Sequence, residues 1–343
     1  EAASSFESAV LSDVSVELLD QVLLTKFTQC TAANTTDHTV RSTGEVLHAR
    51  GLAVRGSKRS DFHATAAAYL LFGQQPANRF PHCEILCDAY DDISISGRPK
   101  VQDSINNAIP HSLEQALQFV DDHTFHPRRV VGLNNMRLDE YPTAALREAL
   151  VNAVAHRSYD DRSRKIFVRT FRDRIEIASP GYLPQPLTLA KLRRGRYRPC
   201  SRNPLMAQTL ATLSMMEQRG SGFARMREAM LNHGLDEPKI EQQDGFFVVC
   251  LPGPDGNYDR IKVPTNASGP ITPAIEAQLN ARQKKIMIET QNAGFVTSGW
   301  CQKTFKVVRD TANRDLVGLV QHGLLEPMGK GRSARYVFKF TSK

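Results

Sequence analysis

The stretch from 141 to 159, YPTAALREALVNAVAHRSY, constrains the fold of this chain most strongly. Its apolar residues recur at helical spacing, and Pro142 suits the first turn of a helix, where its missing N–H costs no hydrogen bond. Glu148, Asn152 and His156 follow one another every four residues. At about 100° per residue they form a second stripe beside the apolar one. The sequence therefore predicts a half-buried helix with three polar groups along one ridge.

Two interpretations of this polar ridge stay open at this point. A carboxylate and a carboxamide one helical turn apart can hold a water molecule and a hydrated magnesium ion against a phosphate chain. A solvated face of an amphipathic helix explains the same spacing, and taken alone it is the commoner explanation. The segments that follow the helix decide between the two.

Length and composition set the broad class. With 343 residues, 41% hydrophobic and 23% charged, the chain fits two or three ordinary globular domains. It has no run of 18 apolar residues, so we expect no membrane span. Six dispersed cysteines and scattered histidines favour reduced thiols in a cytoplasmic protein without a metal cage of its own. The first residues, Glu1-Ala2-Ala3, lack an initiator Met and a signal core, so we expect the natural protein to continue upstream.

The positive charge is concentrated near the C-terminus. Residues 1–135 carry 11 basic and 16 acidic side chains, whereas residues 282–343 carry 12 basic and 4 acidic ones. The excess in this last segment equals the whole net charge of +8. Such a concentration points to a polyanionic partner.

The segments after the central helix alternate between strands, loops and helices. A predicted hairpin spans 165–178 and ends at Ser179-Pro180-Gly181, and a Lys/Arg-rich stretch then leads to Arg202 and Asn203. Gly220-Ser221-Gly222 opens a helix, where backbone N–H groups and the helix dipole favour phosphates. Taken alone, a turn between two helices is the commoner explanation of a lone G-x-G. The chain contains neither G-x-x-x-x-G-K-[ST] nor G-x-S-x-G, which disfavours a Walker-type helicase motor and a serine hydrolase.

The C-terminal segment has the pattern of a winged helix-turn-helix domain. Three helices are predicted at 282–292, 299–306 and 311–322, the last capped by Asp310, and a hairpin with its tip at 329–332 follows. The third helix would read the major groove of DNA, and the hairpin would contact phosphates or the minor groove. The expected DNA-binding residues are Arg309, Thr311, Asn313 and Arg314 on the helix, and Lys330, Arg332 and Arg335 on the hairpin. Winged helices also serve as dimerisation or docking modules, but the charge excess favours DNA.

The order of these motifs resembles the GHKL ATPase superfamily, and more closely its bacterial branch of RecG-related, AlbA/Schlafen-domain transcriptional regulators. The likeness covers about residues 40–255. Its motifs are AAAYLLFG at 66–73, the central helix at 141–159, DRIEIASPG at 173–181, SRNP at 201–204 and EQRGSGFARM at 217–226. TANRDL at 311–316, in the predicted winged helix, also fits this family.

The resemblance implies roles for the residues that match. Glu148 would be the general base, Asn152 the ligand of a magnesium ion bound with ATP, and Ser179 and Gly181 would lie at the adenine pocket. The remaining expected cofactor-binding residues are His156, then Arg202 and Asn203 in a segment positioned like the mobile lid, and Gly220, Ser221 and Gly222 against the phosphates. One departure weakens this expectation: the family has D-x-G-x-G where this chain has Ser179-Pro180-Gly181, and a hydroxyl accepts a hydrogen bond more weakly than a carboxylate.

The sequence thus predicts an α+β protein, with an α/β two-layer sandwich as a GHKL-like body and a C-terminal winged helix-turn-helix domain. The expected boundaries are an N-terminal α/β region at 1–135, a nucleotide-binding domain at 136–252, a linker at 253–281 and the DNA-binding domain at 282–343. The function expected first is a DNA-binding transcriptional regulator, whose nucleotide could gate DNA binding or formation of a homodimer. The alternatives are a slow magnesium-dependent ATPase and a scaffold that binds no nucleotide.

Overall fold

The computed structural model describes residues 5–33, 42–58, 60–95, 97–131, 134–195, 197–198, 200–217, 220–263, 278–329 and 334–339. The chain divides into two compact units. The first comprises Glu1–His126 and Asp139–Lys262, and the second comprises Pro127–Leu138 and Val263–Lys343. Both units mix helices with antiparallel strands, which confirms the predicted α+β class. No helix in the described ranges is long and apolar enough to cross a membrane.

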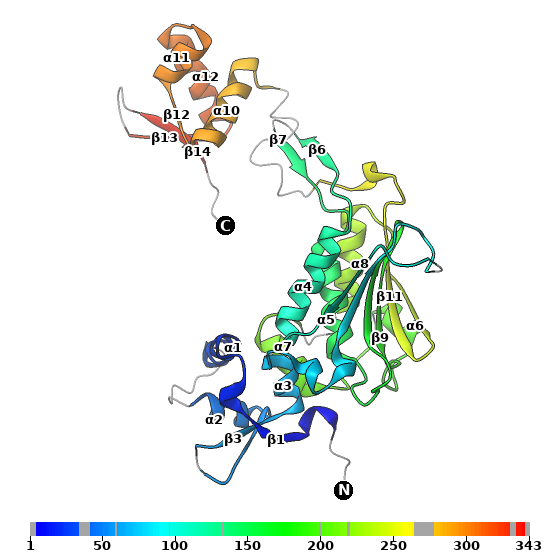
Figure 1. The fold of residues 1–343 in the computed structure, drawn as a ribbon. Coiled ribbons are helices and arrows are strands. Elements are labelled where there is room, and N and C mark those ends of the chain that lie inside the picture. The colour runs from blue at the N-terminus through cyan, green and yellow to red at the C-terminus, as the bar shows by residue number, and fades with distance from the viewer. Residues whose placement is uncertain are drawn as a thin grey trace. The chain divides into compact units, whose positions relative to one another are not determined.

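A six-stranded sheet forms the centre of the first unit (Figure 1). Its order is β10-β11-β9-β8-β4-β5, and only β4 and β8 run parallel within it. The strands are β4 (Ile85–Ala89), β5 (Val101–Ile105), β8 (Ile166–Thr170), β9 (Arg174–Pro180), β10 (Lys239–Gln243) and β11 (Phe246–Pro252). The hairpin predicted at 165–178 is β8–β9, with Phe167 opposite Ala178. The predicted boundary between 135 and 136 runs through this sheet, because β4 and β5 come from the N-terminal region.

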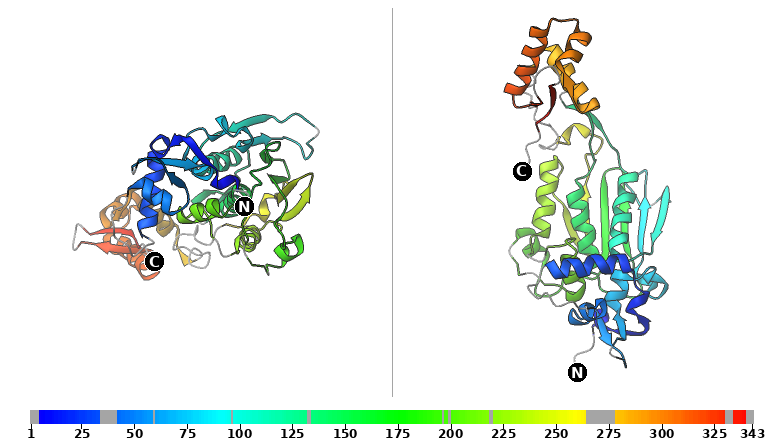
Figure 2. Two further views of the ribbon diagram at one scale, coloured as in Figure 1. Left: turned by 90° about the horizontal axis from the view of Figure 1, so that it is seen from below. Right: turned by 90° about the vertical axis from the view of Figure 1, so that its left-hand side faces the viewer.

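Three helices cover one face of the sheet, namely α4 (Ile109–Asp122), α5 (Thr143–Ala155) and α8 (Gly222–His233) (Figures 1 and 2). Helix α5 is the one predicted from the central stretch, and its apolar stripe is buried. The shorter helices α6 (Leu189–Arg194) and α7 (Pro204–Thr212) complete this part of the unit. Burial of such a stripe against the sheet stabilises α5 more than its intrinsic propensity does.

A smaller sheet, in the order β1-β3-β2, lies at the N-terminal end of the chain. It consists of β1 (Val10–Ser15), β2 (Ala53–Arg55) and β3 (Phe62–Thr65), with α1 (Gln21–Ala33), α2 (Thr43–Ala49) and α3 (Ala66–Phe72). Residues Val16–Leu18 form a separate 3₁₀ turn, and the Asp20 carboxylate accepts from the N–H groups of Val22 and Leu23 at the start of α1. Asp20 therefore caps the helix.

In its described residues, the second unit contains three helices and a three-stranded sheet in the order β12-β14-β13. In chain order these are α10 (Ala281–Ala293), β12 (Val296–Thr297), α11 (Ser298–Phe305), α12 (Arg309–Gln321), β13 (Leu325–Met328) and β14 (Arg335–Phe338). Helix α12 begins at Arg309, so Asp310 lies in its first turn rather than at its cap. The unit also includes a two-stranded hairpin that the sequence did not predict, β6 (Arg128–Val131) with β7 (Asn134–Arg137).

Candidate functional site

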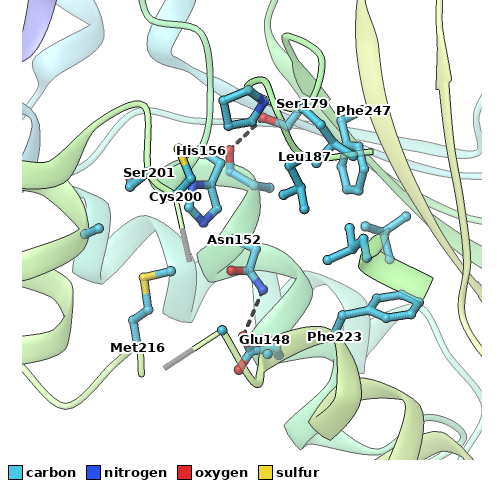
Figure 3. A pocket seen from close by; sticks show the side chains of 18 of the residues that line it. Glu148, Asn152, His156, Ser179, Leu187, Cys200, Ser201, Met216, Phe223 and Phe247 are labelled. Carbon is cyan, nitrogen blue, oxygen red and sulfur yellow. Dashed lines mark hydrogen bonds between the residues drawn. The ribbon is translucent and has the colours of Figure 1, made fainter. Parts of the chain in front are cut away.

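A cavity of about 320 Å³ opens in the first unit, between α5, α7, α8 and the strands β9 and β11. Its walls come from residues between 148 and 249. Figure 3 shows Glu148, Asn152 and His156 in succession along α5, with the apolar side chains Leu187, Phe223 and Phe247 opposite. A concave, mostly apolar site with a few convergent polar groups is the usual form of a small-molecule site.

The polar ridge of α5 lies inside this cavity, so it is not merely a solvated face. The Asn152 Nδ2 donates a hydrogen bond of 2.8 Å to Glu148 Oε1 (Figure 3). The Glu148 side chain is 12% exposed, and Gly222 approaches it so closely that a Cβ there would overlap the carboxylate. Gly222 thus permits the N-terminus of α8 to reach the ridge of α5.

Arg225, one turn into α8, is a residue of this site that the sequence did not single out. Its Nη2 donates a hydrogen bond of 2.7 Å to Glu148 Oε2, and its Nη1 pairs with Glu217. Ser221 Oγ donates to the other oxygen of Glu217, at 3.3 Å. A cation in the first turn opposes the helix dipole unless acids pair with it. The arginine three residues after Gly222 is therefore a signal in the sequence from which acidic partners near this helix end could have been predicted.

The far end of the cavity is formed where β9 ends. Ser179 is buried, and its Oγ donates a hydrogen bond of 2.6 Å to the Ala153 carbonyl on α5 (Figure 3). The hydroxyl oxygen keeps its lone pairs for a ligand donor. Gly181 has φ +108°, and a Cβ there would overlap the guanidinium of Arg202, whose Nη2 donates to the Tyr182 carbonyl at 2.7 Å. Gly181 is therefore required by its backbone and by its neighbour.

His156 ends α5 and lines the cavity. Burial lowers the pKa of its imidazole to about 4, and the positive charge of Arg202 acts in the same direction. The ring is therefore neutral at pH 7 and can serve as a hydrogen-bonding group but not as a cation.

Asn203 has a different place from the one implied for it. It is buried outside the cavity lining, and its Nδ2 donates to the carbonyls of Ala155 and Arg157 at 3.1 and 2.8 Å. These carbonyls belong to the C-terminal end of α5, where backbone acceptors lack intrahelical partners. Asn203 thus holds the end of α5. Arg202 and Ser221 also lie beside the cavity lining rather than in it, whereas Gly220 and Gly222 line it.

The donor set suits the magnesium ion and nucleotide that the resemblance implies. Because Asn152 uses its amide nitrogen for Glu148, its carbonyl oxygen remains, and hard oxygen ligands are those magnesium prefers. Gly220 and Gly222 leave room at the N-terminus of α8, where N–H groups favour phosphate. The apolar wall, which includes Tyr197 and Phe247, suits the flat face of a base.

The predicted DNA-contacting residues lie in the second unit. Arg309 and Arg314 are exposed on α12, while Thr311 is half-buried. The Asn313 Oδ1 accepts a hydrogen bond of 2.8 Å from Ser298 Oγ. Arg335 is exposed, with its guanidinium 4.5 Å from the centre of the Phe295 ring. The other two predicted residues, Lys330 and Arg332, lie outside the described residues.

Comparison with known proteins adds two similarities. Residues 163–251 match the family model described as "Putative ATP-dependent DNA helicase recG C-terminal". The match supports an ATPase-like domain. The fold is similar to that of the DIP2311 protein from Corynebacterium diphtheriae, with a TM-score of 0.57 and 19% identity. The alignment covers 98% of this chain but 65% of that one, and at this identity it concerns the fold alone. No curated protein matches the sequence.

Proposed function

We propose that the first unit is a GHKL-like domain that binds ATP with magnesium in the cavity beside α5, and that the chain is a DNA-binding transcriptional regulator. The observation that carries this proposal is the convergence on one cavity of Glu148, Asn152, Ser179 and the α8 N-terminus. These groups lie in three separate segments that the sequence singled out independently. The ATPase-like match at 163–251 supports the nucleotide-binding part of this proposal.

The cavity offers a suitable surface to each part of the nucleotide. The base would lie at the end with Ser179, whose hydroxyl oxygen would accept from an amino group in place of the missing aspartate. The phosphates would lie at Gly220 and Gly222, and Asn152 would hold a magnesium ion bound with the nucleotide. When bound, this ion would neutralise phosphate charge.

Calorimetric titration of ATP with magnesium tests the proposal. We expect micromolar binding to the wild-type chain and at least tenfold weaker binding to Asn152→Ala, because the substitution removes the proposed magnesium ligand. Asn257→Ala is a matched control, since Asn257 is exposed and absent from the cavity lining. Absence of heat with the wild-type chain, together with an unchanged melting temperature, would favour the scaffold without nucleotide.

A slow ATPase is the second candidate, favoured by the position of Glu148 in the cavity at the proposed phosphate end. Its carboxylate would accept the proton of the attacking water. A Glu148→Ala variant should then lose phosphate release while it still binds ATP. A regulator without turnover would show no phosphate release in either protein.

DNA binding by the second unit rests on its three helices, its small sheet and its charge. Residues 282–343 carry 12 basic and 4 acidic side chains, and Arg309, Arg314 and Arg335 are exposed. We interpret the unit as a winged helix with α12 as its reading helix. Nucleotide would change the affinity for DNA, directly or by forming a homodimer. DNA affinity that ignores both ATP and the Asn152→Ala substitution would contradict this coupling.

A further inference from the structure

The charges at the cavity do not suit a nucleotide as they stand. Among the described residues that line it there are two carboxylates, Glu148 and Glu217, and no lysine or arginine. His156 is no cation at neutral pH, because its pKa lies near 4. A polyphosphate that entered would meet two acids in a partly enclosed, mostly apolar site, where charge repulsion is stronger than in water. Among the described residues, a positively charged side chain for the phosphates therefore has to come from beside this lining.

Arg225 is the cation that lies against both acids. It donates to Glu148 Oε2 at 2.7 Å, pairs with Glu217, and its side chain is 35% exposed. Asn152 donates to the remaining oxygen, Glu148 Oε1, at 2.8 Å. Both oxygens of the Glu148 carboxylate are therefore engaged. In this arrangement two donors compete with water for the Glu148 carboxylate, since each of its oxygens already accepts one hydrogen bond.

We propose that Arg225 is the phosphate-recognising residue of this site. When a nucleotide binds, the Arg225 side chain leaves Glu148 and pairs with the terminal phosphate, which frees the Glu148 carboxylate. The inference rests on the proposed function. A phosphate offers a guanidinium two parallel acceptors and more negative charge than a carboxylate, so it competes well for this side chain. The phosphate would also lie at the N-terminus of α8, where it relieves the unfavourable position of the arginine.

This exchange distinguishes ATP from ADP. Glu148 marks the end of the cavity opposite Ser179, which is the end where the terminal phosphate would lie. ADP lacks that phosphate and would leave Arg225 on its two acids. Arg225 would thus confer preference for the triphosphate, and it would couple that preference to the availability of the Glu148 carboxylate.

Calorimetry of ATP and ADP, each with magnesium, tests the assignment in Arg225→Gln, Arg225→Lys and Arg227→Gln. Arg227 is a matched control, because it lies on the same helix and pairs with Glu237 at 2.6 Å, outside the cavity lining. In Arg225→Gln we expect the Kd for ATP to rise at least tenfold and the Kd for ADP to change less than threefold. Arg225→Lys should restore part of the ATP preference, and Arg227→Gln should match the wild type.

A purely structural ion pair predicts a different result. Arg225→Gln would then weaken the binding of ATP and of ADP by the same factor, or would change neither. Either result would overturn the inference, while weaker ATP binding in Asn152→Ala would still support the proposed function. A wild-type chain that binds neither nucleotide would overturn both. Glu217→Gln removes one partner of Arg225 and keeps the arginine. It should tighten ATP binding several-fold, and weaker ATP binding in this variant would contradict the inference.

Discussion

At the scale of single residues, α8 comes closest to the polar ridge of α5 at Gly222. A methyl group at this position would overlap the Glu148 carboxylate and lie 3.3 Å from Asn152 Nδ2. We therefore expect Gly222→Ala to displace the Glu148 carboxylate from Asn152 and to weaken ATP binding at least tenfold, with the melting temperature lowered by about 2–4 °C. Calorimetry and thermal unfolding measure the two effects.

The control for this prediction is Gly97→Ala, where a methyl group meets nothing within 4 Å. That variant should bind nucleotide as the wild type does. If Gly222→Ala also bound ATP normally, the close packing of α8 against the ridge of α5 would have no part in the site.

His156 makes stability depend on pH. Its pKa is about 4 in the folded chain against its usual 6.5, so between these values the unfolded chain binds more protons. The stability it contributes is complete above pH 6.5 and is lost as the pH falls toward 4. His156→Gln supplies the reference, because glutamine does not titrate. We expect the melting temperature of this variant to fall less between pH 7 and pH 5 than that of the wild type. Equal drops in both proteins would contradict the lowered pKa.

At the scale of elements, a buried guanidinium holds the segment between α5 and β8. Arg157 is fully buried and donates hydrogen bonds of 2.6–3.1 Å to the carbonyls of Ser158, His82, Asp161 and Arg164. Arg157→Met would leave these acceptors without their donor. We expect a loss of about 3 kcal/mol or more in the free energy of unfolding of the first unit, measured by urea denaturation. Arg172→Met, at an exposed position, should cost under about 0.5 kcal/mol. Similar costs in both would show that Arg157 is dispensable.

The elements that the sequence predicted are those with strong periodicity or clear end signals. Helices α5 and α8 and the hairpin β8–β9 are of this kind, since Gly222 and Gly234 flank α8 and Arg172-Asp173 forms the turn of the hairpin. Strands β5 and β10 are mostly polar, with only Ile105 and Ile240 buried, so their apolar pattern is too weak to detect. Their pairing with β4 and β11 is a tertiary property.

The functional site, too, could be predicted from the sequence only where its residues follow a local pattern. Spacing alone placed Glu148, Asn152 and His156 on one ridge, because residues four apart share a helix face. The pairing of Arg225 with Glu148 joins residues 77 positions apart, which no local pattern reveals. Asn203 was assigned to the lid through the family resemblance, whereas its side chain holds the end of α5.

At the scale of the whole molecule, we expect DNA binding that weakens steeply with salt. Each phosphate contact contributes about −0.9 to the slope of log K against log salt concentration. Alanine at Lys330, Arg332 and Arg335 together should therefore make the slope less steep by about 3, measured by fluorescence anisotropy over a salt series. Alanine at Arg79, Arg172 and Arg227 makes the same charge change in the first unit and should leave the slope unaltered. Unchanged DNA binding in the first triple variant would contradict the assignment.

The central claim is that nucleotide occupies the cavity beside α5, and the alkylation rate of Cys200 tests it most directly. Cys200 is exposed and lines the cavity. Cys87 and Cys301 are buried, and burial raises the pKa values of Cys83 and Cys250 to about 12 and 11, so these four thiols react more slowly. We predict that ATP with magnesium slows alkylation of Cys200 in a saturable way, that half-buried Cys30 is unaffected, and that Asn152→Ala abolishes the protection. A Cys200 rate that is independent of ATP at saturating concentration would place the nucleotide elsewhere.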